Sequence, residues 1–523
     1  MLLEGLTLAA ALALCVWLRI RPRLALPNAL FSDTYFHLYV ARVLEEGRLR
    51  LPERLPRIVL RHEHTYPPLY HVALATLPSR WRSVAERVTG AAADCAIVLV
   101  AYVAVRGWMV GDPRAHVAAL FVAFGLVLAP AFLRIGSGPR AYNGSPRPVG
   151  QALFVLYAIA AHAWVADGHP ILLLAGALAT AGVILSSKFS LQVLAFFSVA
   201  FAVCVSPLHA VPPFAGFALA FVAAPYRTAM TLRGHFRHSL FYVRDLQHIF
   251  LHPNERSFMA YIRGAIGQLV GALASRSARA LIDWLFAERQ GLHMLLVAFL
   301  PCVAAPLLAL TRAELAFQER FALVWVGVAL ACFVLTRIRS LLFLGEAERY
   351  LEYALVPALW LCVAWLLPDH TPVLIAYLVF CAAAAAHFQS AYRRAYAGLD
   401  QRTRSTEKLF DLLAERPSGC IMPIGSFHWQ TLYRSRFPVL TIGVNVDSNV
   451  LPRDEFMLVY GRYPYPSPEF DQILDTYDVR YIVSDTVHIA HYTQKILASP
   501  EIFDRRVRLL AAEGGMVLYE VTT

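Results

Sequence analysis

An apolar stretch, MLLEGLTLAAALALCVWLRI at residues 1–20, is followed after a short link by FSDTYFHLYVARVLEEG, Phe31 to Gly47. The first stretch is about as long as a helix needs to be to cross a bilayer. It has neither a basic segment at its start nor a small-residue cleavage site, so we interpret it as a retained membrane span and not as a removable signal. The second stretch places Asp33 and His37 one helical turn apart among aromatic side chains, beside the predicted membrane boundary. The apolar side of the same helix could enter the membrane interface through Phe36, Val40, Val43 and Leu44.

The composition indicates a membrane protein. Of the 523 residues, 58% are hydrophobic and 16% are charged, and soluble proteins of this length are rarely so apolar. The apolar runs fill residues 1–390 and then stop. We therefore expect an α-helical polytopic membrane domain over 1–390, followed by a small soluble α/β domain over 401–523.

Eleven apolar runs have about the length of a transmembrane helix. An odd number of spans places six segments on one face of the membrane: the first loop, the loop at 134–148, the turn at 186–190, the segment at 226–290, the loop at 337–349 and the C-terminal domain. The two short runs, at 170–186 and 211–225, could be re-entrant or tilted. The runs are 2–20, 88–106, 115–133, 149–166, 170–186, 189–206, 211–225, 291–310, 319–336, 350–367 and 371–388.

The net charge of +11 comes from 47 basic and 36 acidic residues. Clustered cations on a membrane protein favour phosphates or anionic lipids as partners, and the chain has no nucleic-acid-binding signature. The face with the long loops carries most of the arginines, among them Arg19, Arg23 and Arg134, so the positive-inside rule would make it cytoplasmic. The alternative is that this face is non-cytoplasmic and that its arginines bind anionic ligands.

Asp33 has two interpretations. Ser32 and Asp33 would make a good helix N-cap pair, and capping is the commonest role of such an acid. The other interpretation is chemical, because a fixed carboxylate can remove the proton from an attacking hydroxyl.

A first span, then an acid followed by aromatics and histidine, then the Tyr66-Pro67-Pro68 stretch, resembles the GT-C superfamily of polyprenyl-phosphate-sugar-dependent membrane glycosyltransferases. The catalytic subunit of oligosaccharyltransferase and the protein O-mannosyltransferases belong to it. In that superfamily the first-loop acid is essential, and Asp33 occupies the matching place. The resemblance implies an inverting glycosyltransferase that moves a hexosyl or pentosyl group from a polyprenyl-phosphate donor to a glycan, lipid or protein acceptor.

The resemblance also implies that the long loops and the C-terminal domain lie on the non-cytoplasmic face of a bacterial-type inner membrane. There the developing charge of a lipid phosphate needs cations around it. Arg140 and Arg147 lie in RIGSGPRAYNGSPRPVG from Arg134, and Lys188 lies in SSKFS as one of three lysines in the chain. Arg349 matches a Glu-Arg-Tyr element of bacterial GT-C proteins and would bind the donor phosphate. Snorkelling arginines and a Glu348–Arg349 surface pair are the structural alternatives.

Further polar residues of the two loops are candidates for substrate or metal contacts: His37, His62, Glu63, His64, Tyr66 and Glu348. Imidazole and carboxylate together suit zinc or manganese. However, three adjacent residues cannot all point at one ion, and the loop at 134–148 has no acid. We therefore expect a transferase that requires no cofactor, with a divalent cation as the alternative. We expect Asp94, inside a span, to pair with Arg87 or with a neighbouring helix.

In the C-terminal domain we expect strands at CIMPI, PVLTI, FMLVY, VRYIVSD and MVLYEV and a helix at PEFDQILDTYD. It has no phosphate-binding loop, so a nucleotide-sugar site is not indicated. We expect the domain to cover the active-site face and to help select the acceptor. One rival function is a transporter or flippase of a lipid-linked saccharide, which needs a basic face but no base. Another is a non-catalytic anchor of an assembly complex.

Overall fold

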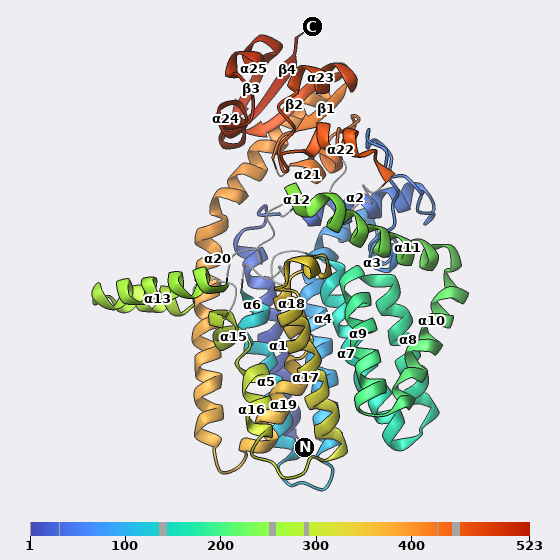
Figure 1. Ribbon diagram of the computed structural model, residues 1–523, viewed down its shortest axis with the longest axis vertical. Helices are drawn as coiled ribbons and strands as arrows, with labels where there is room; N and C mark the ends of the chain where they lie inside the picture. The colour runs from blue at the N-terminus through green and yellow to red at the C-terminus, as the bar shows by residue number, and fades with distance from the viewer. Residues whose placement is uncertain are drawn as a thin grey trace.

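The computed structural model describes residues 2–30, 32–134, 144–249, 258–286, 292–425, 427–441 and 450–522. A bundle of apolar helices forms one end of the molecule and a small α/β unit forms the other, with helix α11 (Pro225–Phe241) crossing between them (Figure 1). The bundle contains α1 (Leu2–Ala25), α4 (Ser79–Trp108), α5 (Ala115–Leu128), α6 (Pro130–Leu133), α7 (Pro146–Asp167), α8 (Pro170–Ser186), α9 (Lys188–Cys204), α10 (Val211–Ala223), α15 (Leu292–Ala298), α16 (Leu300–Ala309), α17 (Phe317–Leu335), α18 (Ala347–Glu352), α19 (Leu355–Leu366) and the start of α20 (Thr371–Ala414).

Six helical segments of the described chain are long and apolar enough to cross a membrane: α1, α4, α5 with α6, α7, α17 and α20. Four shorter apolar helices, α8, α9, α16 and α19, lie beside them, and α10 with α11 forms one bent pair. The eleven predicted runs coincide with these helices. The helical membrane-type fold is therefore confirmed, whereas the number of eleven membrane crossings stays a prediction.

Helices α10 and α11 meet at an angle of 119°. The turn falls at Ala224, which has φ −150° and ψ 65° and precedes Pro225. Proline disfavours the helical conformation in the residue before it, so the chain leaves the helix there. The bend agrees with the prediction that the run at 211–225 is re-entrant or tilted, and it sends α11 across the end of the bundle (Figure 1).

Two buried ion pairs join α1 to α4. Arg19 donates a hydrogen bond to Asp94 over 2.9 Å, and Arg23 donates to both carboxylate oxygens of Glu86 over 3.0 and 2.5 Å. All four side chains are 1% exposed, and a charge is tolerated at such depth only when it is paired. Arg19 and Arg23 are therefore not loop charges, and they should not be counted when the positive-inside rule is applied. The predicted partner of Asp94 on a neighbouring helix is confirmed.

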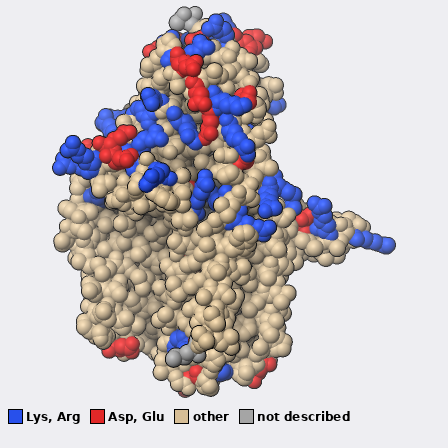
Figure 2. Space-filling model, turned by 180° about the vertical axis from the view of Figure 1, so that it is seen from behind, with Lys and Arg blue, Asp and Glu red and all other residues tan. Residues whose placement is uncertain are grey.

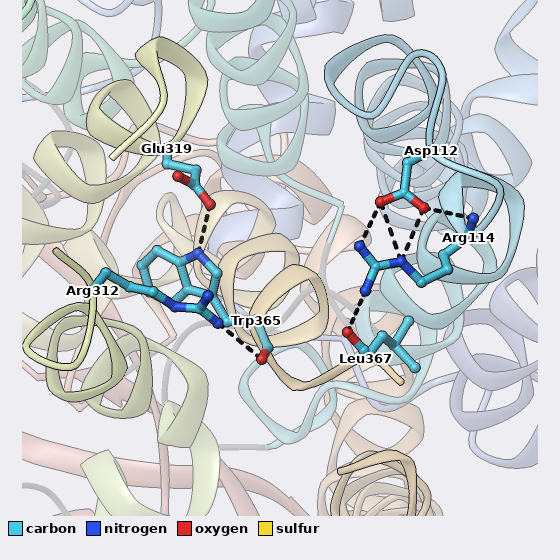
Figure 3. A network of polar contacts seen from close by, with 6 residues as sticks. All are labelled: Asp112, Arg114, Arg312, Glu319, Trp365 and Leu367. Carbon is cyan, nitrogen blue, oxygen red and sulfur yellow. Dashed lines mark hydrogen bonds and ion pairs between the residues drawn. The ribbon is translucent and has the colours of Figure 1, made fainter. Parts of the chain in front are cut away.

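Polar contacts also close the short links at the end of the bundle away from the α/β unit (Figure 3). Arg114 pairs with Asp112 in its own link and donates to the carbonyl oxygen of Leu367 in the link before α20, over 2.6 Å in each case. Arg312 donates to the carbonyl oxygen of Trp365 over 3.1 Å. These contacts satisfy helix-end carbonyls that would otherwise lack partners.

Helix α20 continues for 44 residues from the bundle into the α/β unit (Figure 1). The unit holds one sheet in the order β1-β2-β4-β3, with β1 and β2 parallel and the other neighbours antiparallel. Its strands are β1 (Cys420–Pro423), β2 (Val479–Asp485), β3 (Val507–Glu513) and β4 (Met516–Val521), and its helices are α21 (His428–Arg434), α22 (Arg453–Tyr460), α23 (Phe470–Thr476), α24 (Thr486–Lys495) and α25 (Pro500–Arg506).

The strand predictions were partly wrong. CIMPI, VRYIVSD and MVLYEV are strands and PEFDQILDTYD contains α23, as predicted. FMLVY lies instead in α22, where Asp454 and Glu455 in the first turn favour a helix N-terminus. Over its described residues, PVLTI makes only isolated bridges at Val439. Strand β3 was not predicted, and it reaches β4 through Gly514 and Gly515, whose φ values of +54° and +83° suit glycine.

The α/β unit packs on the first loop through α21 and the helix α2 (Ser32–Glu46). The rings of Phe36 and Trp429 lie 4.5 Å apart, and Arg42 donates to the carbonyl oxygen of Tyr433 over 2.9 Å. The apolar side of α2 was expected to enter the membrane interface, and that interpretation is wrong because the C-terminal unit buries it. The side chains concerned are Phe36, Val40, Val43 and Leu44.

Candidate functional site

A polar cavity of about 220 Å³ lies where the first loop, the bundle and α11 meet. Five parts of the chain line it: the start of α2, the stretch at Tyr66, the start of α7, the start of α9, and the segment around α18. Helix α11 closes another side. The lining residues are Asp33, His37, Tyr66, Ser145, Pro146, Arg147, Ser187, Lys188, Phe189, Gln192, His235, His238, Ser239, Phe343, Leu344, Gly345 and Arg349.

Three cations face this cavity against one acid. Arg147 and Lys188 come from the first turns of α7 and α9, and Arg349 comes from α18. The amino ends of helices add further positive potential, because their amide groups lack partners within the helix. Asp33 is the one carboxylate in the described lining. The cavity therefore favours an anion beside a single carboxylate.

Arg349 has a free edge for a ligand. One of its terminal nitrogens donates to Glu346 over 2.6 Å, and its guanidinium lies 5.8 Å from the ring centre of Phe189. Its Nε is buried and has no hydrogen-bond partner among the described residues. A buried donor of this kind is costly unless something accepts its hydrogen bond. An anionic oxygen in the cavity would do so.

Lys188 and Tyr66 are neighbours in the lining. The Lys188 ammonium donates to the hydroxyl of Thr65 over 3.1 Å and lies 5.9 Å from the centre of the Tyr66 ring. Burial, and then the nearby Asp33 carboxylate, raise the pKa of Tyr66 above its ordinary value. The Tyr66 phenol is therefore neutral at physiological pH and can donate a hydrogen bond to a ligand.

Glu86 holds the start of α2 in place. Besides binding Arg23, its carboxylate accepts hydrogen bonds from the Thr34 hydroxyl over 3.0 Å and from the Gly144 amide over 2.5 Å. A Cβ atom at residue 144 would lie 2.4 Å from the Glu86 side chain, so the close approach requires glycine. Glu86 thus joins α1, α2 and the loop before Arg147. Its contact on α2, Thr34, is the residue next to Asp33.

His37 is fixed by a second histidine. Its Nδ1 lies 2.8 Å from Nε2 of His71, and the two side chains are 2% and 0% exposed. Burial lowers the pKa of His37 well below its ordinary value, and it lowers the pKa of His71 to about 3. Both imidazoles are therefore neutral at physiological pH. Since one nitrogen of His37 is bound to His71, the ring presents its other edge toward the cavity that it lines.

The structure does not bring every predicted site residue to the cavity. Both ring nitrogens of His62 bind backbone groups of its own loop, at Leu55 and Leu60 over 2.8 Å. Glu63 pairs with Arg237 over 3.0 Å, outside the cavity. His64 is 0% exposed, and burial lowers its pKa well below its ordinary value. Arg140 lies outside the described residues.

The surface pair weighed for Glu348 differs from the structure, and two of the residues considered for a metal have other partners. Glu348 is buried and pairs with Arg337, so the Glu348–Arg349 surface pair is wrong. No group of three His, Cys, Asp or Glu among the described residues is placed to hold a metal ion. His62 and Glu63 have other partners, so the described residues do not fit the metal site considered around Asp33.

Four residues near the site were missed from the sequence. His235 and His238 line the cavity from α11, and His71 supports His37. Tyr463 of the α/β unit has a pKa raised by burial, by Tyr460 and by the Asp33 carboxylate, which places it near Asp33. His71 stands in the same Tyr-Pro-Pro stretch as Tyr66, and the spacing of His235 and His238 puts both on one helical face. These two signals could have identified His71, His235 and His238 from the sequence. Nothing in the sequence near Tyr463 points to Asp33.

An apolar groove of about 810 Å³ adjoins the polar cavity. It runs along α8 to α11 and is lined mostly by aliphatic and phenylalanine side chains such as Leu194, Phe214 and Phe236. The groove and the cavity share five lining residues. They are Gln192, His235, Ser239, Phe343 and Leu344.

The fold matches solved structures of an archaeal membrane enzyme. The oligosaccharyltransferase AglB from Archaeoglobus fulgidus, in complex with an inhibitory peptide and a dolichol-phosphate, aligns with a TM-score of 0.55 at 13% identity over 99% of this chain and 74% of that chain. An Archaeoglobus fulgidus oligosaccharyltransferase tethered to an acceptor peptide with an NVT sequon aligns with a TM-score of 0.57 at 13% identity over the same shares.

A third match is ArnT from Cupriavidus metallidurans in the apo state, with a TM-score of 0.42 at 14% identity over 99% of this chain and 97% of that chain. No protein-family model and no curated protein matches the chain. At these identities the comparison shows the fold and not the substrate. The predicted resemblance to the GT-C superfamily is confirmed at the level of the fold by the two oligosaccharyltransferase structures.

Proposed function

We propose that this protein is an integral-membrane inverting glycosyltransferase that moves a sugar from a polyprenyl-phosphate donor to an acceptor hydroxyl. The observation that carries the proposal is the shared cavity of Asp33, Arg147, Lys188 and Arg349, which continues into an apolar groove. Arginine and lysine bind phosphate through charge-assisted hydrogen bonds, and the groove suits a hydrocarbon chain. The archaeal enzyme of the same fold was solved with a dolichol-phosphate, which supports a donor of this class.

The size of the cavity favours a small transferred group. Its volume of about 220 Å³ lies below the roughly 300–1,000 Å³ of pockets that enclose drug-sized ligands. The apolar groove takes the lipid, so the polar cavity has room for a phosphate and a monosaccharide. We therefore infer transfer of a single hexosyl or pentosyl unit.

The proposed reaction is one displacement with inversion. The acceptor hydroxyl oxygen attacks the anomeric carbon while its proton passes to the Asp33 carboxylate. The bond between the anomeric carbon and the phosphate oxygen breaks, and the lipid phosphate leaves with its electron pair. Arg147, Lys188 and Arg349 stabilise the negative charge that develops there. His37 and Tyr66 contact sugar hydroxyls from the same wall of the cavity.

The three cations would supply the positive charge that a divalent ion supplies elsewhere, so the proposed reaction requires no cofactor. Transfer that persists in a chelator supports this part of the proposal, and loss of transfer that manganese or zinc restores contradicts it.

The proposed location is the non-cytoplasmic face of a bacterial-type plasma membrane, in the synthesis of a cell-envelope glycan. The burial of Arg19 and Arg23 in ion pairs weakens the charge count that favoured the opposite orientation. A protease site placed in the link between β3 and β4 tests this. Cleavage from outside intact cells supports the proposed orientation, and cleavage only after lysis contradicts it.

The decisive experiment compares Asp33→Asn with Glu46→Gln, an exposed acid on the same helix. Both variants are reconstituted in nanodiscs with a panel of polyprenyl-phosphate monosaccharides and a panel of acceptors that carry a free hydroxyl, and release of polyprenyl phosphate is measured. We expect Asp33→Asn to bind the lipid and to lose at least about a hundred-fold in release, in line with a general base, whereas Glu46→Gln keeps the full rate. A flippase would move the lipid across vesicles equally well with either variant, so unchanged lipid movement without sugar release would favour that rival.

A further inference from the structure

Helix α11 presents three chemically different faces. His235, His238 and Ser239 line the polar cavity, and Leu232, Phe236 and Ser239 line the apolar groove. A third face carries Arg233 and Arg237, and the π-helical turn η2 (Tyr242–Leu246) continues it with Arg244. Arg233 and Arg237 share a helical face because they are four residues apart, and Arg244 lines the same hollow from the turn that follows. The third face is outside the site described above.

This row of arginines lines a hollow of about 860 Å³ together with Arg61 of the first loop. The remaining lining is Glu63, Leu240, Phe241, Val243 and Val450, so the described lining has four arginines and one acid. Glu63 is shared between Arg237 at 3.0 Å and Arg233 at 3.7 Å. Arg244 pairs with Asp245, outside the lining, over 2.6 Å. Two carboxylates cannot neutralise four arginines, so the hollow retains a positive potential.

The surroundings of the hollow point to the membrane surface. Leu240 and Val243 line both the hollow and the apolar groove, so a ligand with a charged head and a hydrocarbon chain would satisfy both. Lys and Arg side chains gather in a band between the side of the bundle, where other residues dominate, and the α/β unit (Figure 2). The band lies at the level where α11 crosses the bundle (Figure 1). Lipid phosphates lie at this level of a membrane protein.

We propose that Arg61, Arg233, Arg237 and Arg244 form a second phosphate-class site that binds the head group of an anionic membrane lipid. Its acyl chains lie along Leu240 and Val243. The site is separated from the donor cavity by α11, and it holds an anion whether or not the protein transfers sugar. Glu63 limits the affinity, because it occupies part of the donor capacity of Arg233 and Arg237.

The test measures lipid retention by the full-length protein. The protein is incubated with equal amounts of phosphatidylglycerol and phosphatidylcholine, purified again, and the retained lipids are quantified by mass spectrometry. Each arginine near an anionic surface contributes about five-fold to binding, so Arg233→Gln with Arg237→Gln should lower phosphatidylglycerol retention by roughly thirty-fold relative to phosphatidylcholine. The matched control, Arg480→Gln with Arg508→Gln, removes the same two charges from the α/β unit and should change nothing.

Glu63→Gln provides a change of opposite sign. It leaves every arginine in place and removes their shared acid, so it should raise phosphatidylglycerol retention. A general loss of folding cannot produce a rise. Equal retention by the Arg233/Arg237 variant and the unchanged protein would overturn the proposal, as would an equal loss in the Arg480/Arg508 control. Displacement of the lipid by excess inorganic phosphate would show that the site binds free phosphate. This result too would contradict the proposal that its ligand is a membrane lipid.

Discussion

Replacing Glu86 with glutamine should both destabilise the protein and impair the proposed site. The Glu86 carboxylate accepts hydrogen bonds from Arg23, Thr34 and the Gly144 amide. The amide of glutamine would leave the Arg23 charge buried at 1% exposure without a counter-ion. Removing one partner of such a pair costs about 3–5 kcal/mol of the free energy of unfolding.

The functional effect should be specific to this ion pair, and Asp94→Asn is the control. Asp94 pairs with Arg19 on the same two helices, but Arg19 also donates to the backbone oxygens of Val127 and Leu126, and neither contact reaches α2. Both variants should unfold at lower denaturant concentration, while Glu86→Gln alone should also lower sugar release at a temperature where both remain folded. The reason is that Glu86, unlike Asp94, contacts the start of α2, which carries Asp33.

A compensated variant separates charge burial from site geometry. Arg23→Leu with Glu86→Leu removes both charges and should regain most of the lost stability, because hydrophobic residues often replace a buried ion pair without a cost. It should not regain activity, because Thr34 and the Gly144 amide still lack their acceptor. A Glu86→Gln protein within about 1 kcal/mol of the original stability, or with the original rate of sugar release, would refute this reasoning.

Three further predictions concern the cavity and its cover. Burial lowers the pKa of His37 and His71 below their ordinary value, so the unfolded state binds more protons below about pH 6.5. Acid should therefore reduce the free energy of unfolding by up to about 1.4 kcal/mol per histidine and pH unit. The denaturation midpoint of His71→Gln should fall less steeply with acid than that of the unchanged protein, and an equal slope would contradict this prediction. Arg349→Gln should weaken binding of polyprenyl phosphate roughly ten- to hundred-fold in a calorimetric titration, and equal affinity would remove Arg349 from the phosphate site. Trp429→Ala should cost about 3–5 kcal/mol through the cavity left beside Phe36, with faster proteolysis of the link to the α/β unit, whereas unchanged proteolysis would contradict the observed packing.

The helices of the bundle could be predicted because they are apolar runs, six of them long enough to cross a membrane, and a membrane span is the commonest structure of such a run. The convergence of Asp33, Arg147, Lys188 and Arg349 could also be predicted as a shared face, since the odd number of runs puts their loops on one side. Short apolar runs carry less information, because a five-residue run such as FMLVY fits a strand or a buried helix equally well. Pro452 and the acids after it were the better signal there.

The remaining errors concern contacts between distant residues. The sequence does not show that Arg19 and Arg23 contact acids about 63 to 75 positions later. Without that contact, an arginine at the end of a span cannot be distinguished from a charged residue of the adjoining loop. The apolar side of α2 has the same pattern whether lipid or protein covers it. Its cover comes from Trp429 and its neighbours, nearly 400 residues later in the chain. His71 could be seen in the sequence, but its contact with His37 depends on how the Tyr-Pro-Pro stretch folds back on α2.

A density map of the full-length protein with bound polyprenyl phosphate tests the central claim most directly. The account predicts that the phosphate lies among Arg147, Lys188 and Arg349, that the chain follows the groove past Phe214 and Phe236, and that Asp33 faces the space left for the sugar. A phosphate bound away from these cations, or one separated from Asp33 by closed protein, would contradict the account.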